Sequence, residues 1–231
     1  MQTLSIRRTN KGISSAKANY LYWMGRYAER VYLSLHMLRK HHDLMIDQDG
    51  NAYIDYCNKM SISNQYATEE QFLYSYLYDT ENPVSIIRML HLLNDNAILI
   101  REEITSETLS YIQMSIYFME NAKKENKILS ELQTITDYML AFWGSVDERI
   151  AKLDIRRTIK YGKFVESADI HIRFNYPFER IENINIRLNE CLEQNSEIFD
   201  EIKLLAYKNQ MTVEKYCEPL TLYYLNGLFN A

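Results

Sequence analysis

The amino-acid sequence predicts an all-helical bundle, and three observations point to it. The chain has 231 residues but only 6 Gly and 3 Pro, where average usage would supply roughly 16 and 12. Turns rely on these residue types, so a sandwich or a barrel would have too few of them. Apolar residues recur at spacings of three and four, as on one face of a helix. The apolar fraction of 47% is large enough for a packed core.

The first helix has the clearest pattern. A core stripe predicts a helix near residues 18–48, and its apolar members are Leu21, Met24, Ala28, Val31, Leu35 and Leu38. Residues 51–64 are ambiguous, and a shorter helix is expected over residues 69–78. We expect about six to eight helices in total.

Cap signals organise the middle of the chain. Asn82-Pro83 is typical of an N-cap followed by proline at the first helical position, which predicts a helix from there to about Ile104. Ser106 can cap a continuation of this helix after a kink. The next helix, from Ile128, can break near Gly144. The last expected elements are helices over residues 154–174 and 178–205 and a shorter apolar segment over 212–229.

Charge, cysteine content and hydropathy exclude several classes of protein. The net charge is −5 and the basic residues are scattered, so we expect no binding to nucleic acid. Three distant cysteines in no metal-ligand spacing are typical of a reduced cytoplasmic protein. No apolar run reaches the roughly 18 residues of a membrane span, and none follows the N-terminus as a signal peptide would. We expect a flexible arm over residues 1–16 and one domain over residues 17–231.

No metal or cofactor is expected. None of the five histidines has Glu or Asp three residues before it, which is the spacing of di-iron bundles. No glycine-rich phosphate loop is present, so ATP chemistry would lie on a partner.

Six of the 19 tyrosines gather between residues 50 and 80. Tyrosine is amphipathic and enriched at interfaces, so this region could bind a partner. Packing at the edges of the core is the alternative. The six are Tyr53, Tyr56, Tyr66, Tyr74, Tyr76 and Tyr78.

An internal repeat is the most informative feature of the sequence. Gly25-Arg26-Tyr27-Ala28-Glu29-Arg30 recurs as Gly162-Lys163-Phe164-Val165-Glu166-Ser167, each inside a predicted helix. Glycine within a helix costs about 1 kcal/mol relative to alanine. We therefore expect these two glycines to allow the close approach of a backbone or a ligand.

The repeat places charged residues where the two helices would meet. If the helices pack through their glycines, Glu29 and Glu166 approach each other, and three basic residues can neutralise them. This arrangement is either a partly buried ion-pair network or a polar pocket. In a pocket, Glu29 and Glu166 would be the catalytic candidates. The substrate-binding candidates would be Tyr22, Arg26, Arg30 and Lys163, with Arg101 and Glu107 either joining them or lying on a solvated helix face.

The segment from Asn19 to Arg30, NYLYWMGRYAER, closely resembles the opening signature of the bacterial Alpha-E family, a helical domain named for its Glu-Arg motif. Later segments are similar to that family in the expected order. They are Asn82-Pro83 with Ser85-Ile86, Asn96-Ala97 with Arg101, Ile104 to Glu107, and the second copy from Gly162 to Asp169. Within that second copy, Lys163, Phe164 and Ser167 stand where the family motif usually has Arg, Tyr and Arg.

The resemblance implies a setting and a role. Alpha-E proteins are typically encoded beside, or fused to, circularly permuted ATP-grasp ligases and transglutaminase-like proteins, which implies ATP-dependent peptide synthesis or modification. The chain would then be an accessory component that binds the ligase or its peptide substrate. Alternatively, it would be an enzyme of that system, with Glu29 and Glu166 as acid/base groups and Arg26 and Arg30 holding a carboxylate or phosphate. A self-associating scaffold is a third interpretation.

Overall fold

The computed structural model describes residues 13–47, 52–125, 132–192 and 198–230. This part of the chain is all-helical, as predicted, but it contains ten helices rather than six to eight. They are α1 (Ser15–Asp47), α2 (Ala52–Met60), α3 (Glu69–Tyr78), α4 (Ile86–Leu99), α5 (Ser106–Lys124), α6 (Gln133–Arg149), α7 (Leu153–Arg173), α8 (Phe178–Leu192), α9 (Glu201–Gln210) and α10 (Pro219–Asn226).

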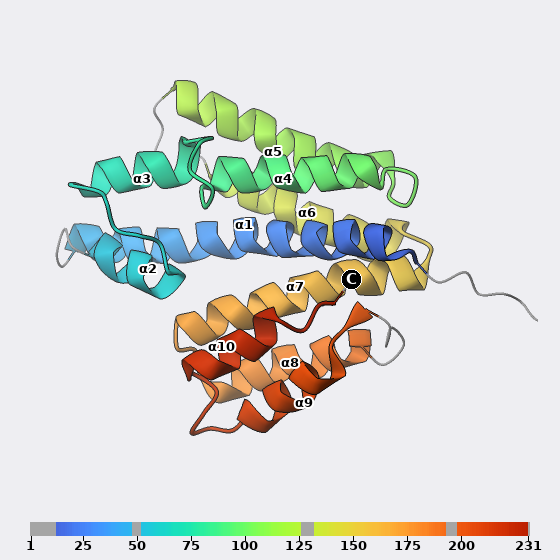
Figure 1. The fold of residues 1–231 in the computed structure, drawn as a ribbon. Coiled ribbons are helices and arrows are strands. Elements are labelled where there is room, and N and C mark those ends of the chain that lie inside the picture. Colours follow the sequence, from blue (N-terminus) through green and yellow to red (C-terminus); the bar gives the residue numbers. More distant parts are fainter. Residues whose placement is uncertain (1–12, 48–51, 126–131, 193–197, 231) are drawn as a thin grey trace, which may run out of the picture.

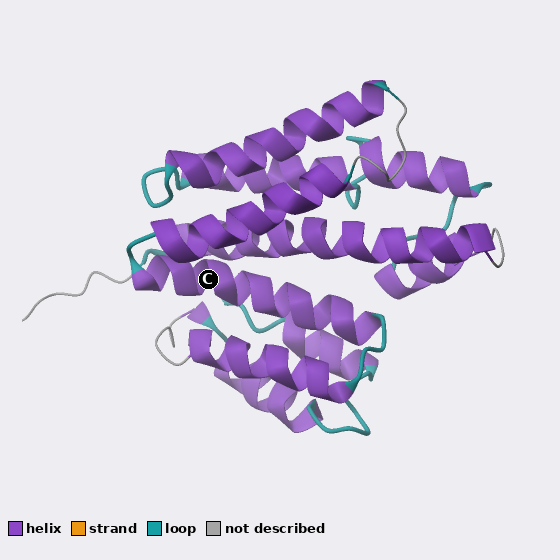
Figure 2. Cartoon of the chain, turned by 180° about the vertical axis from the view of Figure 1, so that it is seen from behind, coloured by secondary structure: helices purple, strands orange, loops and turns teal. Residues whose placement is uncertain are grey.

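The long helix α1 runs through the middle of the molecule (Figure 1). Helices α3 to α6 lie on one side of it, and α7 to α10 lie on the other. The rear view shows the same two groups, with every drawn element helical (Figure 2). A large apolar core fills the first group, and a second core fills the α7–α10 group. The packing of α1 against α7 therefore joins the two halves of the structure.

Two predicted helices had nearly correct boundaries, because their apolar spacing is regular. The predicted helix over 69–78 is α3, whose N-cap Thr68 accepts a hydrogen bond from the backbone of Gln71. The predicted helix over 154–174 is α7. Helix α1 reaches Asp47, and its predicted end near residues 48–50 lies outside the described residues. Gly144 does not break α6, which continues to Arg149.

Two cap predictions were wrong. Asn82 does not begin a helix, because its side chain accepts a hydrogen bond from Val84 in a turn. Ser85 is the N-cap of α4 instead. The helix ends at Leu99 rather than near Ile104, and Thr105, not Ser106, is the N-cap of a separate helix α5.

The long final helix predicted over residues 178–205 is also wrong. It consists of two helices, and Asp200 begins the second by accepting a hydrogen bond from the backbone of Lys203. Of the predicted arm over residues 1–16, residues 1–12 lie outside the described part, and Ser15 already belongs to α1.

The tyrosines between residues 50 and 80 mostly pack inside the molecule. Tyr53, Tyr56, Tyr76 and Tyr78 are buried in the first core, whereas Tyr74 is 48% exposed. Packing thus accounts for most of this cluster. No helix within the described ranges is long and apolar enough to cross a membrane.

Candidate functional site

Two glycines bring α1 and α7 into direct backbone contact. A Cβ atom on Gly25 would lie 2.0 Å from the carbonyl oxygen of Ile159, and one on Gly162 would lie 2.0 Å from the carbonyl oxygen of Tyr22. No real side chain tolerates such distances, so only glycine fits. The contacts are reciprocal, because Ile159 precedes Gly162 by as many residues as Tyr22 precedes Gly25. The two copies of the repeat therefore pack on each other with local twofold symmetry, as expected from the sequence.

Glu166 lies beside this contact, and its carboxylate pairs with two arginines. Nε of Arg26 donates a hydrogen bond to one carboxylate oxygen, and Nε of Arg30 donates to the other. The Glu166 side chain is 1% exposed. Removing one partner of such a buried pair leaves an uncompensated charge, so the network fixes the register of the two helices. Neither oxygen of Glu166 faces solvent.

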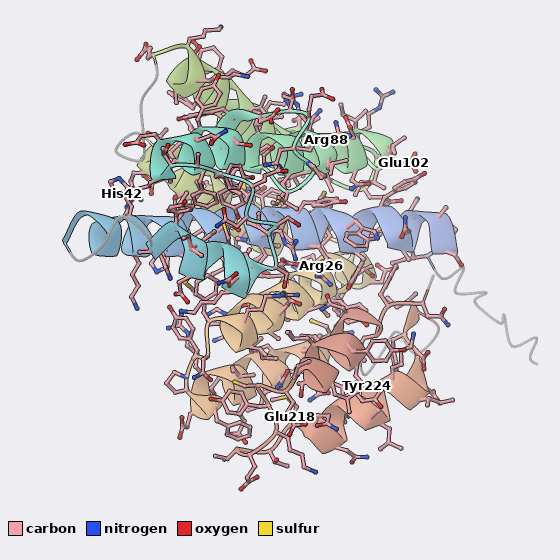
Figure 3. The ribbon with its side chains drawn as sticks, turned by 60° about the vertical axis from the view of Figure 1, so that its left-hand side comes forward. Arg26, His42, Arg88, Glu102, Glu218 and Tyr224 are labelled. Atoms are coloured by element: carbon pink, nitrogen blue, oxygen red, sulfur yellow. The ribbon has the colours of Figure 1, made fainter. Side chains whose placement is uncertain are left out.

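Arg26, which is labelled in Figure 3, connects three elements through its guanidinium group. Besides Glu166 on α7, it donates from Nη1 to the hydroxyl of Tyr22 at 3.0 Å and from Nη2 to Oδ1 of Asn226, on α10, at 2.9 Å. Tyr22 stacks on Phe229, with ring centroids 3.9 Å apart. The C-terminal segment thus covers one side of the α1–α7 contact. The Nε, Nη1 and Nη2 groups of Arg26 therefore all donate to protein atoms.

Asp169 extends the network one turn further along α7. Its Oδ1 accepts a hydrogen bond from Nδ2 of Asn226 at 2.6 Å, and its Oδ2 accepts one from Nε of Arg173 at 2.6 Å. Burial raises the pKa of Asp169, but the hydrogen bond and charge of Arg173, the charge of Arg26 and the hydrogen bond from Asn226 together outweigh it and hold the pKa below its ordinary value. Asp169 therefore stays charged and holds α10 against α7.

Glu29 occupies the position that mirrors Glu166, but it is poorly neutralised. Its side chain is buried, and Oε2 has no hydrogen-bond partner in the described part of the chain. Burial raises the pKa of Glu29 to about 7, the ammonium of Lys163 opposes this rise, and the Glu166 carboxylate adds to it. Ser167 and Trp143 lie close enough to favour the charged form, although the Trp143 Nε1 atom makes no hydrogen bond to any described residue. Glu29 is thus a carboxyl group that can exchange a proton near neutral pH.

The difference between the two carboxylates follows from the sequence of the repeat. By the symmetry of the contact, Glu166 receives Arg26 and Arg30, whereas Glu29 receives the corresponding Lys163 and Ser167. Nζ of Lys163 lies 4.1 Å from the ring centroid of Trp143 and makes no ion pair within 4.0 Å among the described residues. Serine supplies no charge at all. The second copy therefore leaves Glu29 without the two guanidinium groups that Glu166 has.

The structure places the remaining predicted residues away from this network. Arg101 is exposed in the loop after α4. Glu107 is exposed at the start of α5, where it pairs with Nε of Arg149 at 3.3 Å. Among the described residues, neither shares a contact with Glu29 or Glu166.

Asn226 and Trp143 belong to the site, although no sequence pattern pointed to them. Asn226 lies far from the repeat in sequence and reaches it only because α10 folds back on α7. Asp169 was not proposed as a site residue, although its spacing of three from Glu166 was a usable signal. Within the described ranges, no three His, Cys, Asp or Glu side chains come together as a metal site would require.

A comparison with protein families matches residues 13–193 to the Alpha-E model, a predicted alpha-helical domain with a conserved ER motif. The match covers both copies of the repeat, and Glu29-Arg30 is the Glu-Arg pair of the first copy. Helices α9 and α10 lie beyond it. No curated protein and no solved structure matches the chain. The extent of the family match shows that this chain belongs to the Alpha-E family.

Proposed function

We propose that the protein is an accessory, partner-binding component of a cytoplasmic bacterial system in which an ATP-grasp ligase synthesises or modifies peptides. The observation that carries this proposal is the use of the Glu-Arg motif. Arg30 neutralises Glu166 inside the contact of α1 with α7, and Glu29 is buried in the same contact. A motif that holds helices together suits a binding component, which presents a rigid surface to another protein.

The exposed apolar side chains of the C-terminal helices support a role in binding. Large apolar side chains on a protein surface mark interaction sites when they gather. On α9, Ile202 is 83% exposed and Leu205 is 62% exposed, and their spacing of three puts them on one face. On the neighbouring α10, Tyr223 is 65% exposed. These helices lie outside the family match, so they are the first surface to test for contact with a partner.

The test is a binding measurement with an ATP-grasp ligase encoded in the same genomic neighbourhood. Co-expression followed by size-exclusion chromatography should give a complex, with a dissociation constant of about 10 μM or tighter by calorimetry. The double variant Ile202→Glu/Leu205→Glu should weaken it about tenfold or more. Leu99→Glu is the control, because Leu99 is 60% exposed on α4, on the opposite side of α1. Absence of binding by the unmodified chain at micromolar concentration would overturn the proposal.

The properties of Glu29 favour a second candidate function, that of an enzyme in the same system. A buried carboxyl group with a pKa of about 7 and one unpartnered oxygen has the protonation behaviour of a general acid/base. Lys163 beside it would hold an anionic substrate group, whereas Arg26 and Arg30 would first have to leave Glu166. The variant Glu29→Gln decides between the two candidates. Loss of pathway product with the fold and ligase binding intact supports the enzyme, and unchanged product supports the accessory role.

A further inference from the structure

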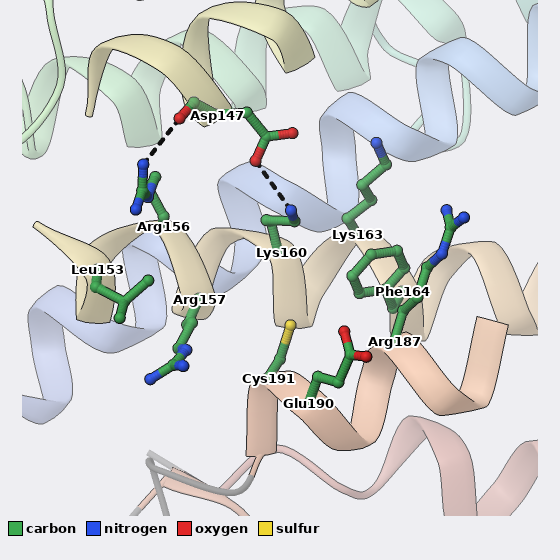
Figure 4. Close-up of a pocket in the computed structure, with 10 residues that line it drawn as sticks. All are labelled: Asp147, Leu153, Arg156, Arg157, Lys160, Lys163, Phe164, Arg187, Glu190 and Cys191. Carbon is green, nitrogen blue, oxygen red and sulfur yellow. Dashed lines mark hydrogen bonds and ion pairs between the residues drawn. The ribbon is translucent and has the colours of Figure 1, made fainter. Parts of the chain in front are cut away.

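A cavity of about 410 Å³ lies where α7 and α8 face the end of α6 (Figure 4). It is separate from the buried Glu166 network, and it shares Lys163 with the surroundings of Glu29. We call it the basic pocket, and it is lined by Asp147, Leu153, Arg156, Arg157, Lys160, Lys163, Phe164, Arg187, Glu190 and Cys191.

The basic pocket concentrates positive charge in an otherwise acidic protein. Among the described residues, five basic side chains line it against two acidic ones, although the whole chain has a net charge of −5. The sequence alone suggested scattered basic residues. Folding gathers them, because Arg156, Lys160 and Lys163 recur at spacings of four and three on one face of α7, and Arg187 faces them from α8.

The two acidic residues leave part of this charge uncompensated. Asp147 neutralises one of the cations, because its Oδ1 pairs with Lys160 at 2.9 Å. Its backbone oxygen accepts a hydrogen bond from Arg156 at 2.8 Å but carries no charge. In the described part of the chain, Lys163 and Arg187 have no carboxylate within ion-pair distance. Burial lowers the pKa of the Lys163 ammonium, and the charges of Lys160 and Arg187 lower it further, against the opposing pull of Glu29 and Asp147. Unneutralised like charges repel each other, so an anion placed between them would be attracted.

The basic pocket also has apolar walls, so its ligand should carry an apolar part as well as negative charge. Phe164 and Cys191 are buried in its floor, and Leu153 is 47% exposed at its edge. Ligand sites commonly combine such apolar walls with a few convergent polar groups. The volume is enough for a small molecule but not for a folded segment.

We propose that the basic pocket binds a small organic anion that carries two or more negative charges on an apolar body. Lys163 and Arg187 hold the anionic group, and Phe164 and Leu153 contact the body. The guanidinium of Arg187 suits phosphate and carboxylate oxygens equally, because its fork of donors fits both. This inference is independent of the proposed accessory role, because it concerns a different surface and needs no protein partner; it shares Lys163 with the enzyme candidate.

Isothermal titration calorimetry with three aromatic probes tests the proposal at low ionic strength. Phenyl phosphate carries a phosphate dianion, phthalate carries two carboxylates, and benzoate carries a single negative charge. We expect a dissociation constant of about 1 mM or tighter for at least one dianion, and binding of benzoate about tenfold weaker. Tighter binding of phenyl phosphate identifies a phosphate ligand, and tighter binding of phthalate identifies a polycarboxylate. Binding should weaken as salt is added, because the attraction is electrostatic.

Variants of the basic pocket complete the test. Arg187→Gln should weaken binding of the preferred dianion about tenfold, as expected for loss of a charge-assisted hydrogen-bond donor. Arg187 is exposed and makes no ion pair in the described structure, so this variant should keep its thermal stability. Lys163→Gln should weaken binding similarly. Arg88→Gln is the control, because Arg88 is an exposed arginine on α4 (Figure 3). The proposal is overturned if neither dianion binds the unmodified chain below about 10 mM, if benzoate binds as tightly as the dianions, or if Arg187→Gln binds as well as Arg88→Gln.

Discussion

Adding one methyl group at Gly25 should force α1 and α7 apart. In the variant Gly25→Ala, the new Cβ would lie 2.0 Å from the carbonyl oxygen of Ile159, about 1.4 Å closer than the 3.4 Å at which ordinary contact begins. The atom that it meets belongs to the backbone of a helix, so no side-chain rotation relieves the overlap. The helices must separate, and Arg26 and Arg30 then lose their positions on Glu166.

Two opposing effects determine the expected change in the stability of Gly25→Ala. Alanine favours the helical conformation over glycine by about 1 kcal/mol. Overpacking a well-packed interior costs about 1–3 kcal/mol for side chains and more where the neighbour cannot move. A rigid backbone neighbour and the nearby buried ion pair put this site at the upper end, so we expect a net loss of about 2 kcal/mol. For a chain of this size, that lowers the melting temperature by roughly 4–8 °C.

Gly144→Ala is the matched control, because Gly144 also lies inside a helix but a Cβ there would meet no described atom within 4 Å. It should gain stability by up to about 1 kcal/mol. Urea denaturation compares four variants: Gly25→Ala, Gly144→Ala, Gly162→Ala and the double variant Gly25→Ala/Gly162→Ala. The double variant should lose less than the sum of the single losses, because helices already separated accept the second methyl group. A stability gain for Gly25→Ala equal to that of Gly144→Ala would refute the reasoning.

Three further predictions concern the charges at this contact. Glu166→Gln should destabilise the fold by about 3 kcal/mol or more in urea denaturation, because two guanidinium groups lose their shared carboxylate; a loss below about 1 kcal/mol would contradict the network. Between pH 4.5 and about 7 the folded protein keeps a proton on Glu29 that the unfolded chain releases, so stability should fall by up to about 3 kcal/mol as pH rises through this range. Glu29→Gln should remove that slope, and identical pH profiles for it and the unmodified chain would show that Glu29 does not titrate there. Asn226→Ala removes the bonds to Arg26 and Asp169 and should cost about 1–3 kcal/mol, with faster proteolysis of α10; unchanged proteolysis would show that these bonds do not hold the C-terminal helices.

The sequence was sufficient to predict the contact of α1 with α7, because the residues that indicate it are neighbours within each helix. A glycine within a helix is unfavourable by itself, so its presence at two matching places requires a tertiary cause. The spacing of Arg26, Glu29 and Arg30 then follows from the period of the helix. Fold class and most helices were predicted for the same reason, since apolar spacing repeats over many residues.

Features that depend on tertiary placement could not be predicted in this way. The break between α8 and α9 was missed because apolar residues keep the helical period across it. Asn226 reaches Arg26 only through the return of α10 against α7. The basic pocket draws on three helices, and its α7 members alone look like an ordinary solvated face. Only the packing of α8 against that face turns them into a cavity with excess charge.

Lys163 connects the candidate acid/base group with the basic pocket. It is the basic residue that lowers the pKa of Glu29, and it lines the pocket from α7. When Glu29 is charged, its attraction for Lys163 reduces the positive charge available to an anion in the pocket. When Glu29 is protonated, that charge is fully available. Because coupling between two binding equilibria is reciprocal, an anion in the pocket must raise the pKa of Glu29 as much as the proton strengthens anion binding. The replacement of two arginines by Lys163 and Ser167 in the second copy therefore does more than weaken an ion pair, because it leaves Glu29 able to titrate near neutral pH and links that titration to an anion bound at the surface.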